Sequence, residues 1–108
     1  MEQRFYSPHE IVVKSGEEGT EMFIISHGHV EVTQDETILA TLKEGQFFGE
    51  SALIEHTVRN ADVISQNYCD LYVLSKEDFL EVTQKFPNLL KRFAEVHRLR
   101  KKKIKRAA

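Results

Sequence analysis

The 108-residue chain has few of the features that point to several common protein classes. Its single cysteine, Cys69, excludes an internal disulfide and cannot by itself form a zinc site. We expect this thiol to pack as a small buried hydrophobic side chain. No apolar run approaches the roughly 20 residues that a membrane-spanning helix needs. The sequence therefore excludes a disulfide scaffold and predicts no membrane-spanning helix in this stretch.

The arrangements that enzymes and metal sites use are also missing. No Ser/His/Asp or Cys/His arrangement has local support. Two histidines, His27 and His29, bracket a turn glycine without a carboxylate or cysteine at a recognised ligand spacing. The other three histidines, His9, His56 and His97, are scattered along the chain. We therefore expect no metal site, no catalytic residues and no enzymatic activity.

The composition is that of a small soluble globular protein, with 41% apolar and 30% charged residues. At this length we expect one domain covering residues 1–108. The formal net charge of −2 hides an uneven distribution. Positions 91–106 hold nine of the fifteen cations and one acid, so residues 1–90 carry six cations and sixteen acids, a balance of −10. An anion pocket in so acidic a region needs local donors, and few are available.

Short apolar segments separated by turn residues run through the first 75 positions. Several short strands with glycine turns favour a β sandwich or barrel. In the segment Thr37–Leu42 we expect Ile38, Ala40 and Leu42 to face one way, and we interpret Gly19 as a turn glycine. The predicted strands are Arg4–Ser7, Ile11–Lys14, Met22–Ile25, Val30–Thr33, Thr37–Leu42, Ala61–Ile64 and Cys69–Leu74.

The hydrophobic period changes to that of a helix after Ser75. This serine is a suitable N-cap because acidic residues follow it in the first turn. Pro87 interrupts the pattern, since a proline disfavours helical geometry in the residue before it. We expect a second helix from Asn88 to Arg106. One stripe of this helix, at steps of three and four, contains Leu89, Phe93, Val96, Arg100 and Ile104. Packing against the core is one explanation of the stripe, and a lid over a ligand is the other.

The stretch Phe48–Val63, FGESALIEHTVRNADV, has the features of a small anion pocket. Gly49 lets the backbone approach a ligand, and Ser51–Ile54 can begin a short helix whose free N–H groups favour an anion. Arg59 presents a planar fork of donors suited to phosphate oxygens. Glu50 is unfavourable there unless it accepts hydrogen bonds, for example from sugar hydroxyls. The alternative is a loop closed by a Glu50–Arg59 pair.

This spacing, F-G-E-x-A-L followed by R-x-A and then D-V, resembles the phosphate-binding cassette of cyclic-nucleotide-binding domains. The upstream pattern M-F-I-I-x-x-G-x-V-x-V is similar to the early strands of the same family. The segment Y-C-D-L-Y-V-L-S-K-E-D-F is similar to the last strand and hinge of pacemaker and cyclic-nucleotide-gated channels. The resemblance implies a mainly β fold with α: an antiparallel, jelly-roll-like β-roll (about 1–75) with a short cassette helix, and two C-terminal hinge and lid helices (about 76–106).

The resemblance also implies roles for individual residues. Arg59 would pair with the cyclic phosphate, and Glu50 would accept a hydrogen bond from the ribose 2′-hydroxyl. The remaining cassette residues implied at the site are Phe48, Gly49, Ser51, Ala52, Asn60 and Ala61. Apolar positions around the base would be Val32, Ala40 and Leu42, and the lid would contribute Arg100 and Ile104. Channels that respond well to cyclic GMP often carry Thr at the position of Asn60, so we favour cyclic AMP as the ligand, with cyclic GMP as the alternative.

The function implied is that of a regulatory module that binds a cyclic nucleotide and moves its C-terminal helix. We expect no other cofactor and no nucleic-acid partner. We expect the chain to be part of a larger protein, with a membrane channel or transporter in cis, a cytoplasmic location and possible oligomerisation through that parent. Two alternatives stay open. One is a ligand-free docking module of the same fold, and the other is the sensor domain of a transcription regulator.

Overall fold

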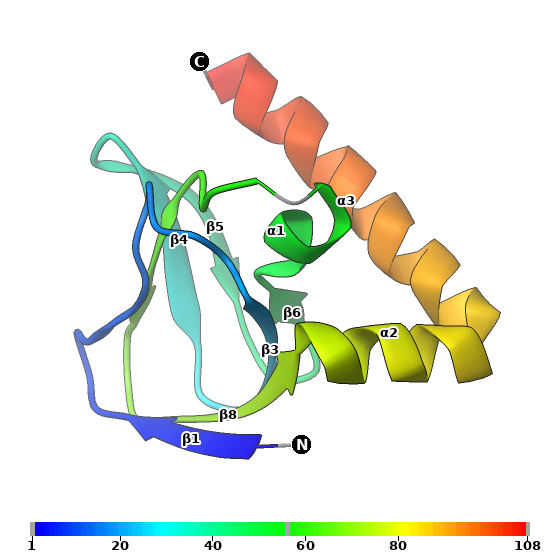
Figure 1. The fold of residues 1–108 in the computed structure, drawn as a ribbon. Coiled ribbons are helices and arrows are strands. Elements are labelled where there is room, and N and C mark those ends of the chain that lie inside the picture. Colours follow the sequence, from blue (N-terminus) through cyan, green and yellow to red (C-terminus); the bar gives the residue numbers. More distant parts are fainter. Residues whose placement is uncertain (1, 56, 108) are drawn as a thin grey trace.

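A computed structural model describes the backbone of residues 2–55 and 57–107 and the side chains as far as residue 101. Two four-stranded antiparallel sheets form the body, with strand orders β1-β8-β3-β6 and β2-β7-β4-β5 (Figure 1). The predicted antiparallel β-roll with a cassette helix and two C-terminal helices is confirmed. Its elements are β1 (Glu2–Tyr6), β2 (Ile11–Val13), β3 (Glu21–His27), β4 (Val30–Gln34), β5 (Thr37–Leu42), β6 (Phe47–Phe48), α1 (Glu50–Glu55), β7 (Asp62–Ser65), β8 (Cys69–Ser75), α2 (Lys76–Lys85) and α3 (Pro87–Ala107).

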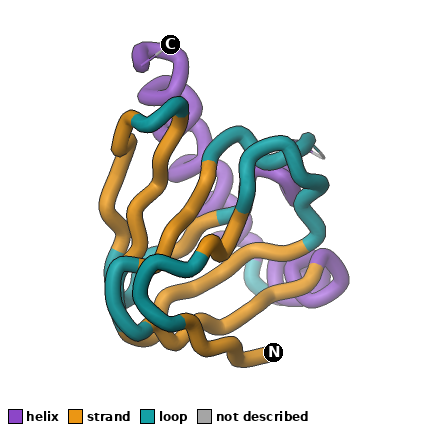
Figure 2. The backbone as a smooth tube through the Cα atoms, turned by 90° about the vertical axis from the view of Figure 1, so that its left-hand side faces the viewer, coloured by secondary structure: helices purple, strands orange, loops and turns teal. Residues whose placement is uncertain are grey.

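The main core lies between the two sheets, where the inward side chains of alternating strand positions meet. In Figure 2 the strands and their loops face the viewer, and α2 and α3 lie behind them. Cys69 is 3% exposed and belongs to this core, as predicted. Burial raises the pKa of its thiol, which keeps it protonated and unreactive. The other buried members are Val13, Phe23, Ile25, Val30, Leu42, Phe48, Val63, Leu71 and Val73.

Strand β5 differs from the prediction because it contains a β-bulge. Val32 of β4 pairs with Ala40, and the next residue, Thr33, pairs with Ile38, so Leu39 is the extra residue. On the N-terminal side of the bulge, the side chains of β5 that face the core and those that face solvent are exchanged. Leu39 is therefore 9% exposed, whereas Ile38 is 56% exposed. The expectation that Ile38 shares the buried face was wrong.

The start of α2 is as predicted from its N-cap. The Ser75 Oγ accepts a hydrogen bond from the Asp78 N–H at 3.1 Å, which satisfies one of the free donors of the first turn. Helix α2 ends at Lys85, and α3 begins at Pro87, one residue earlier than expected. Proline suits the first position of a helix, because its N–H would have no partner there.

A second apolar cluster attaches α3 to the roll. Phe93 of α3 lies 4.8 Å from the Phe47 ring in an edge contact and 5.8 Å from the Phe79 ring in a stacked one, measured between centroids. Two more residues of the predicted stripe, Leu89 and Val96, pack against the same cluster. Core packing therefore accounts for the first half of the stripe. Within the described residues, no helix is long and apolar enough to cross a membrane.

Candidate functional site

A pocket opens between the β4–β5 hairpin, helix α1 and helix α3. It encloses about 730 Å³ of empty space, part of it open to solvent. Its walls are apolar towards the roll and charged towards the two helices. The lining residues are Val13, Val32, Leu39, Ala40, Leu42, Phe48, Gly49, Glu50, Ser51, Arg59, Asn60, Ala61, Val63, His97, Arg100 and Lys101.

Arg59 is buried at the back of this pocket, with 8% of its surface exposed. Its Nη1 donates to the Gly49 carbonyl at 2.8 Å and its Nη2 to the Glu21 carbonyl at 2.6 Å. Burial lowers the pKa of the guanidinium, while the nearby carboxylates of Glu21, Glu50 and Glu17 oppose this effect. An arginine remains protonated throughout the physiological range. The pocket therefore contains a desolvated fixed cation whose orientation is set by two backbone carbonyls.

Glu50 opens α1 and is even more buried, at 3% exposure. Its Oε1 accepts from the Arg100 Nη1 at 2.9 Å. The other terminal nitrogen of Arg100 donates to the Phe47 carbonyl at 2.6 Å, and the guanidinium carbon lies 5.0 Å from the centre of the Phe47 ring. The carboxylate is thus neutralised by the lid helix. The alternative of a loop closed by a direct Glu50–Arg59 pair was wrong.

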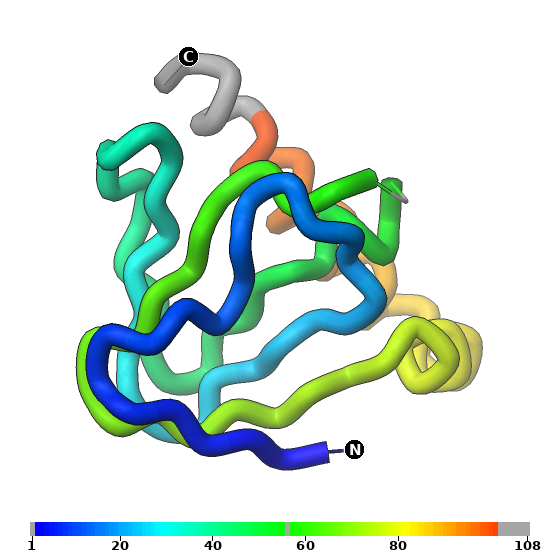
Figure 3. The backbone as a smooth tube through the Cα atoms, turned by 60° about the vertical axis from the view of Figure 1, so that its left-hand side comes forward, coloured from blue at the N-terminus to red at the C-terminus, as the bar shows by residue number. Residues whose placement is uncertain are grey.

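The loop between β2 and β3 fixes the backbone on either side of Arg59. The Gly16 N–H donates to the Arg59 carbonyl at 2.8 Å, and the Arg59 N–H donates to the Glu17 carbonyl at 2.8 Å. Figure 3 shows this loop (blue) alongside the segment that precedes β7 (green). Because both hydrogen-bonding groups of Arg59 are used, its main chain is held as if it were in a sheet.

Gly19, in the same loop, has a role that differs from the predicted one. Its φ is not in the left-handed region, so no turn geometry demands glycine there. Instead, a Cβ at this position would lie 2.2 Å from the Ala52 Cβ and 2.9 Å from the Arg59 Cζ. Gly49 needs to be glycine for two reasons. Its φ of +86° is in the left-handed region, and a Cβ there would lie 2.9 Å from the Arg59 Nη1. Glycines on two sides therefore make room for the arginine.

The structure brings eleven of the thirteen predicted site residues to the pocket wall. The side chain of Ala52 is not part of this wall, because it points to the Gly19 side of α1 and lines a separate cavity there. Ile104 lies within α3, and its side chain is outside the described residues. The residues found at the wall are Val32, Ala40, Leu42, Phe48, Gly49, Glu50, Ser51, Arg59, Asn60, Ala61 and Arg100.

Five wall residues were not predicted from the sequence. Val13, Leu39 and Val63 complete the apolar side. His97 and Lys101 extend the charged side from α3, at positions three before and one after Arg100. The signal for these two was the face of the helix. His97 lies three residues before Arg100, and Lys101 lies three residues before Ile104, and both Arg100 and Ile104 had been placed in the stripe.

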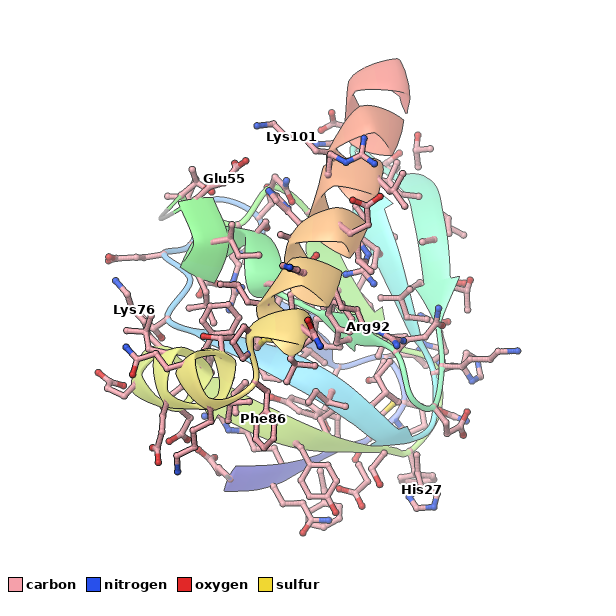
Figure 4. The ribbon with its side chains drawn as sticks, turned by 90° about the vertical axis from the view of Figure 1, so that its right-hand side faces the viewer. His27, Glu55, Lys76, Phe86, Arg92 and Lys101 are labelled. Atoms are coloured by element: carbon pink, nitrogen blue, oxygen red, sulfur yellow. The ribbon has the colours of Figure 1, made fainter. Side chains whose placement is uncertain are left out.

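His97 and Lys101 both contact Glu55, the last residue of α1. The His97 Nε2 and the Lys101 Nζ each lie 2.9 Å from the Glu55 Oε1. Figure 4 shows Glu55 and Lys101 reaching towards one another from α1 and α3. The contact with His97, followed by that with Lys101, lowers the pKa of the Glu55 carboxyl to about 2. His97 is 8% exposed, and its Nε2 has no well-aligned hydrogen-bond partner among the described residues, so its contact with Glu55 is electrostatic.

Comparisons of the sequence agree with this picture. The family model for the cyclic nucleotide-binding domain matches residues 3–86. Cyclic nucleotide-gated channel alpha-4 of Mus musculus is 38% identical over 95 residues, which cover 81% of this chain and 16% of the channel. The cGMP-dependent protein kinase 2 of Homo sapiens is 34% identical over 98 residues, which cover 84% of this chain and 13% of the kinase. The chain thus spans less than a fifth of the length of these curated relatives.

Solved structures share the fold over almost the whole chain. One, described as cAMP-bound PfPKA-R (141-441), gives a TM-score of 0.85 at 29% identity and covers 98% of this chain and 36% of that one. Another, described as Sp-2Cl-cAMPS bound to PKAR CBD2, gives a TM-score of 0.81 at 28% identity and covers 95% of this chain and 70% of that one. The arrangement of two sheets, cassette helix and C-terminal helices is therefore a recurrent one.

Proposed function

The chain belongs to the cyclic nucleotide-binding domain family, and we propose that it binds cyclic AMP in the pocket between α1, α3 and the roll. The observation that carries this proposal is that one short cassette holds two buried, opposite charges that do not bond each other. Arg59 and Glu50 are 8% and 3% exposed, yet Arg59 bonds backbone carbonyls and Glu50 bonds a residue of another helix. A buried charge is costly unless an opposite charge or hydrogen bonds compensate it, and a bound ligand with a phosphate and a hydroxyl would contribute to compensating both.

The proposed pose places the cyclic phosphate against Arg59 and the backbone N–H groups of Gly49, Ser51 and Ala52. Two donors of the guanidinium already bond carbonyls, and its three remaining N–H groups are available for phosphate oxygens. The ribose 2′-hydroxyl would donate to Glu50. The ligand then lies between the two charges and satisfies both, which an isolated carboxylate beside a phosphate would not.

The base would occupy the apolar wall of the roll. Val32, Ala40 and Leu42 lie on neighbouring strands there, and the bulge residue Leu39 adds to the same wall. Asn60 lines the pocket beside the arginine, with Phe48 and Ala61 at either end of the cassette. An amide at position 60 lacks the hydroxyl that would favour guanine, which supports cyclic AMP over cyclic GMP.

Transmission would use α3, which contacts α1 through charges and the roll through Phe93. A ligand hydroxyl on Glu50 would share its carboxylate with Arg100, which bonds Oε1, so occupancy changes the surroundings of Arg100. Arg100 and Ile104 lie four positions apart on one face of α3 and would then close over the base. The ligand shifts the position of α3 by its differential affinity for the two states.

The attached effector that we propose is a membrane channel, with this domain on its cytoplasmic side. The similarity to cyclic nucleotide-gated channel alpha-4 supports this choice. The similarity to cGMP-dependent protein kinase 2 favours a kinase as the second candidate, in which the whole protein would be an enzyme. In both cases the module itself is regulatory.

Calorimetric titration with cyclic AMP and with cyclic GMP tests the proposal. We expect Arg59→Ala to weaken binding about 10- to 150-fold, since a hydrogen bond to a charged group contributes roughly 1.5–3 kcal/mol. Arg59→Lys keeps the charge without the fork and should also bind weakly. The matched control is Arg92→Ala, an exposed arginine of α3 outside the pocket (Figure 4). A folded wild-type domain that releases no heat with either nucleotide would contradict the proposal and favour a ligand-free docking module.

A further inference from the structure

We infer that Glu55 is a positioning residue that fastens the lid helix α3 to the cassette helix α1 through His97 and Lys101, and thereby sets ligand affinity in a pH-dependent way. This inference rests on the proposed function, because it concerns the affinity of the same pocket. It starts from a convergence of charges that the proposed ligand contacts do not use. The name Glu55 latch is used below for Glu55, His97 and Lys101.

The Glu55 latch connects the end of α1 to one face of α3. Glu55 ends α1, where the carbonyl end of a helix disfavours a carboxylate. His97 and Lys101, one turn apart on α3, place their nitrogens at 2.9 Å from the same Oε1. The side chain of His97 is 11% exposed and that of Lys101 is 51% exposed. The contact of Glu55 with His97 is therefore largely shielded from solvent, whereas its contact with Lys101 is exposed and can be screened by salt.

The Glu55 latch differs from the other charged contact between the same helices. The Glu50–Arg100 pair uses a carboxylate that the proposed ligand would also contact, so the ligand acts on that pair directly. Glu55 is absent from the pocket wall, although its two partners, His97 and Lys101, line it. A ligand can therefore enter without breaking the Glu55 latch. Contacts of this kind favour the docked position of α3 before and after binding, and a larger docked population raises the apparent affinity.

The histidine makes the fastening depend on pH. A protonated imidazole places a positive charge 2.9 Å from the carboxylate, whereas a neutral imidazole does not. The other charged groups that line the pocket together with His97 are Glu50 from α1, Arg100 and Lys101 from α3 itself, and Arg59 from the segment before β7. Strand β5 also packs against α3 and has no titratable residue, and the charged residues of α2 lie at the opposite end of α3. Glu55 is thus the carboxylate in contact with the imidazole among the described residues.

The sign follows from these charges. Acidification from about pH 8 to about pH 6 favours the imidazolium over the neutral imidazole by mass action, while the Glu55 carboxyl, with its pKa near 2, stays ionised. The attraction between α1 and α3 therefore increases over this range. We expect the affinity for cyclic AMP to be about fivefold higher at pH 6 than at pH 8.5, a coupling of ordinary size.

Two variants of the Glu55 latch and one control variant are compared in the same calorimetric titration. Glu55→Gln should weaken binding at pH 6 by about fivefold and remove most of the pH dependence. His97→Gln should remove the pH dependence and leave affinity near the high-pH value. Glu95→Gln is the matched control, because Glu95 is a carboxylate of α3 that pairs with Arg98 on the same helix. Glu55→Gln binding as tightly as wild type, with an unchanged pH slope, would overturn the inference.

A second measurement needs no ligand and keeps this inference separate from the proposed function. A double-mutant cycle of Glu55→Gln and His97→Gln, followed by urea unfolding, gives the coupling between the two side chains. The coupling should be favourable at pH 6 and clearly smaller at pH 8.5. If the cycle shows this coupling while neither nucleotide binds, the proposed function fails and the fastening stands. Coupling that is absent at both pH values overturns the fastening itself.

Discussion

The replacement Gly19→Ala tests whether a close contact, rather than a turn, requires glycine in the β2–β3 loop. The added Cβ would lie 2.2 Å from the Ala52 Cβ and 2.9 Å from the Arg59 Cζ. Ordinary contacts of this kind are about 3.5–4 Å. Either α1 or the arginine must therefore move by roughly 1 Å or more, and both belong to the proposed phosphate site.

The expected cost comes from overpacking. Inserting one methyl group into a tightly packed region destabilises a protein by about 1–3 kcal/mol. The loop is partly exposed and can absorb some of this strain by shifting Arg59. Binding requires Arg59 in its original place, so a ligand would have to restore the strained arrangement. If the full strain returns on binding, the affinity falls by about 5- to 150-fold.

The matched control is Gly16→Ala in the same loop. Gly16 has φ of +88°, and a Cβ there would meet nothing within 4 Å. This variant should lose about 1–2 kcal/mol of stability from left-handed backbone strain and bind with little change. Urea unfolding gives the stability of each variant, and calorimetry gives its affinity. If Gly19→Ala binds like wild type, or if Gly16→Ala loses as much affinity, the close-contact explanation is refuted.

Two further predictions concern stability alone. Ser75→Ala removes the acceptor for the Asp78 N–H and should lower the free energy of unfolding by about 1 kcal/mol in urea, whereas Ser75→Asp should retain most of it. The second follows from the depressed pKa of Glu55, about 2 against the ordinary 4.5. Such a carboxylate contributes stability above pH 4.5 and loses it as the pH falls towards 2, so the stability difference between wild type and Glu55→Gln should narrow over that interval. A difference that stays constant with pH would contradict the assigned contacts.

Much of the fold could be predicted because it depends on local patterns. Short apolar runs between turn residues indicated the strands of the roll, and the change of period after Ser75 indicated the helices. The cap at Ser75 depends on residues three apart in sequence, and the structure confirms it. The proposed site could also be predicted from the sequence. Most of its residues lie in one stretch, from Phe48 to Ala61, and their chemistry can be interpreted from residue types and spacing.

The exceptions all depend on pairing or packing between segments, which the pattern within a single segment does not show. A bulge in the pairing of β4 with β5 exposes Ile38 and buries Leu39, which no alternation along one strand can indicate. Gly19 is small because Arg59, forty positions later, passes beside it. Likewise, Arg100 was assigned to the lid, but its ion pair with Glu50, fifty positions earlier, arises only from the packing of α3 against α1.

The sequence by itself determined the strands apart from the short β6, the start of α2 and the short stretch that could bind an anion, because periodicity, capping and turn chemistry act over a few residues. Tertiary structure alone decided the neighbours of each charge. Electrostatic interactions fall off steeply with distance and depend on burial, so the partners of Arg59, Glu50 and Glu55 became known only when the roll and α3 were packed together.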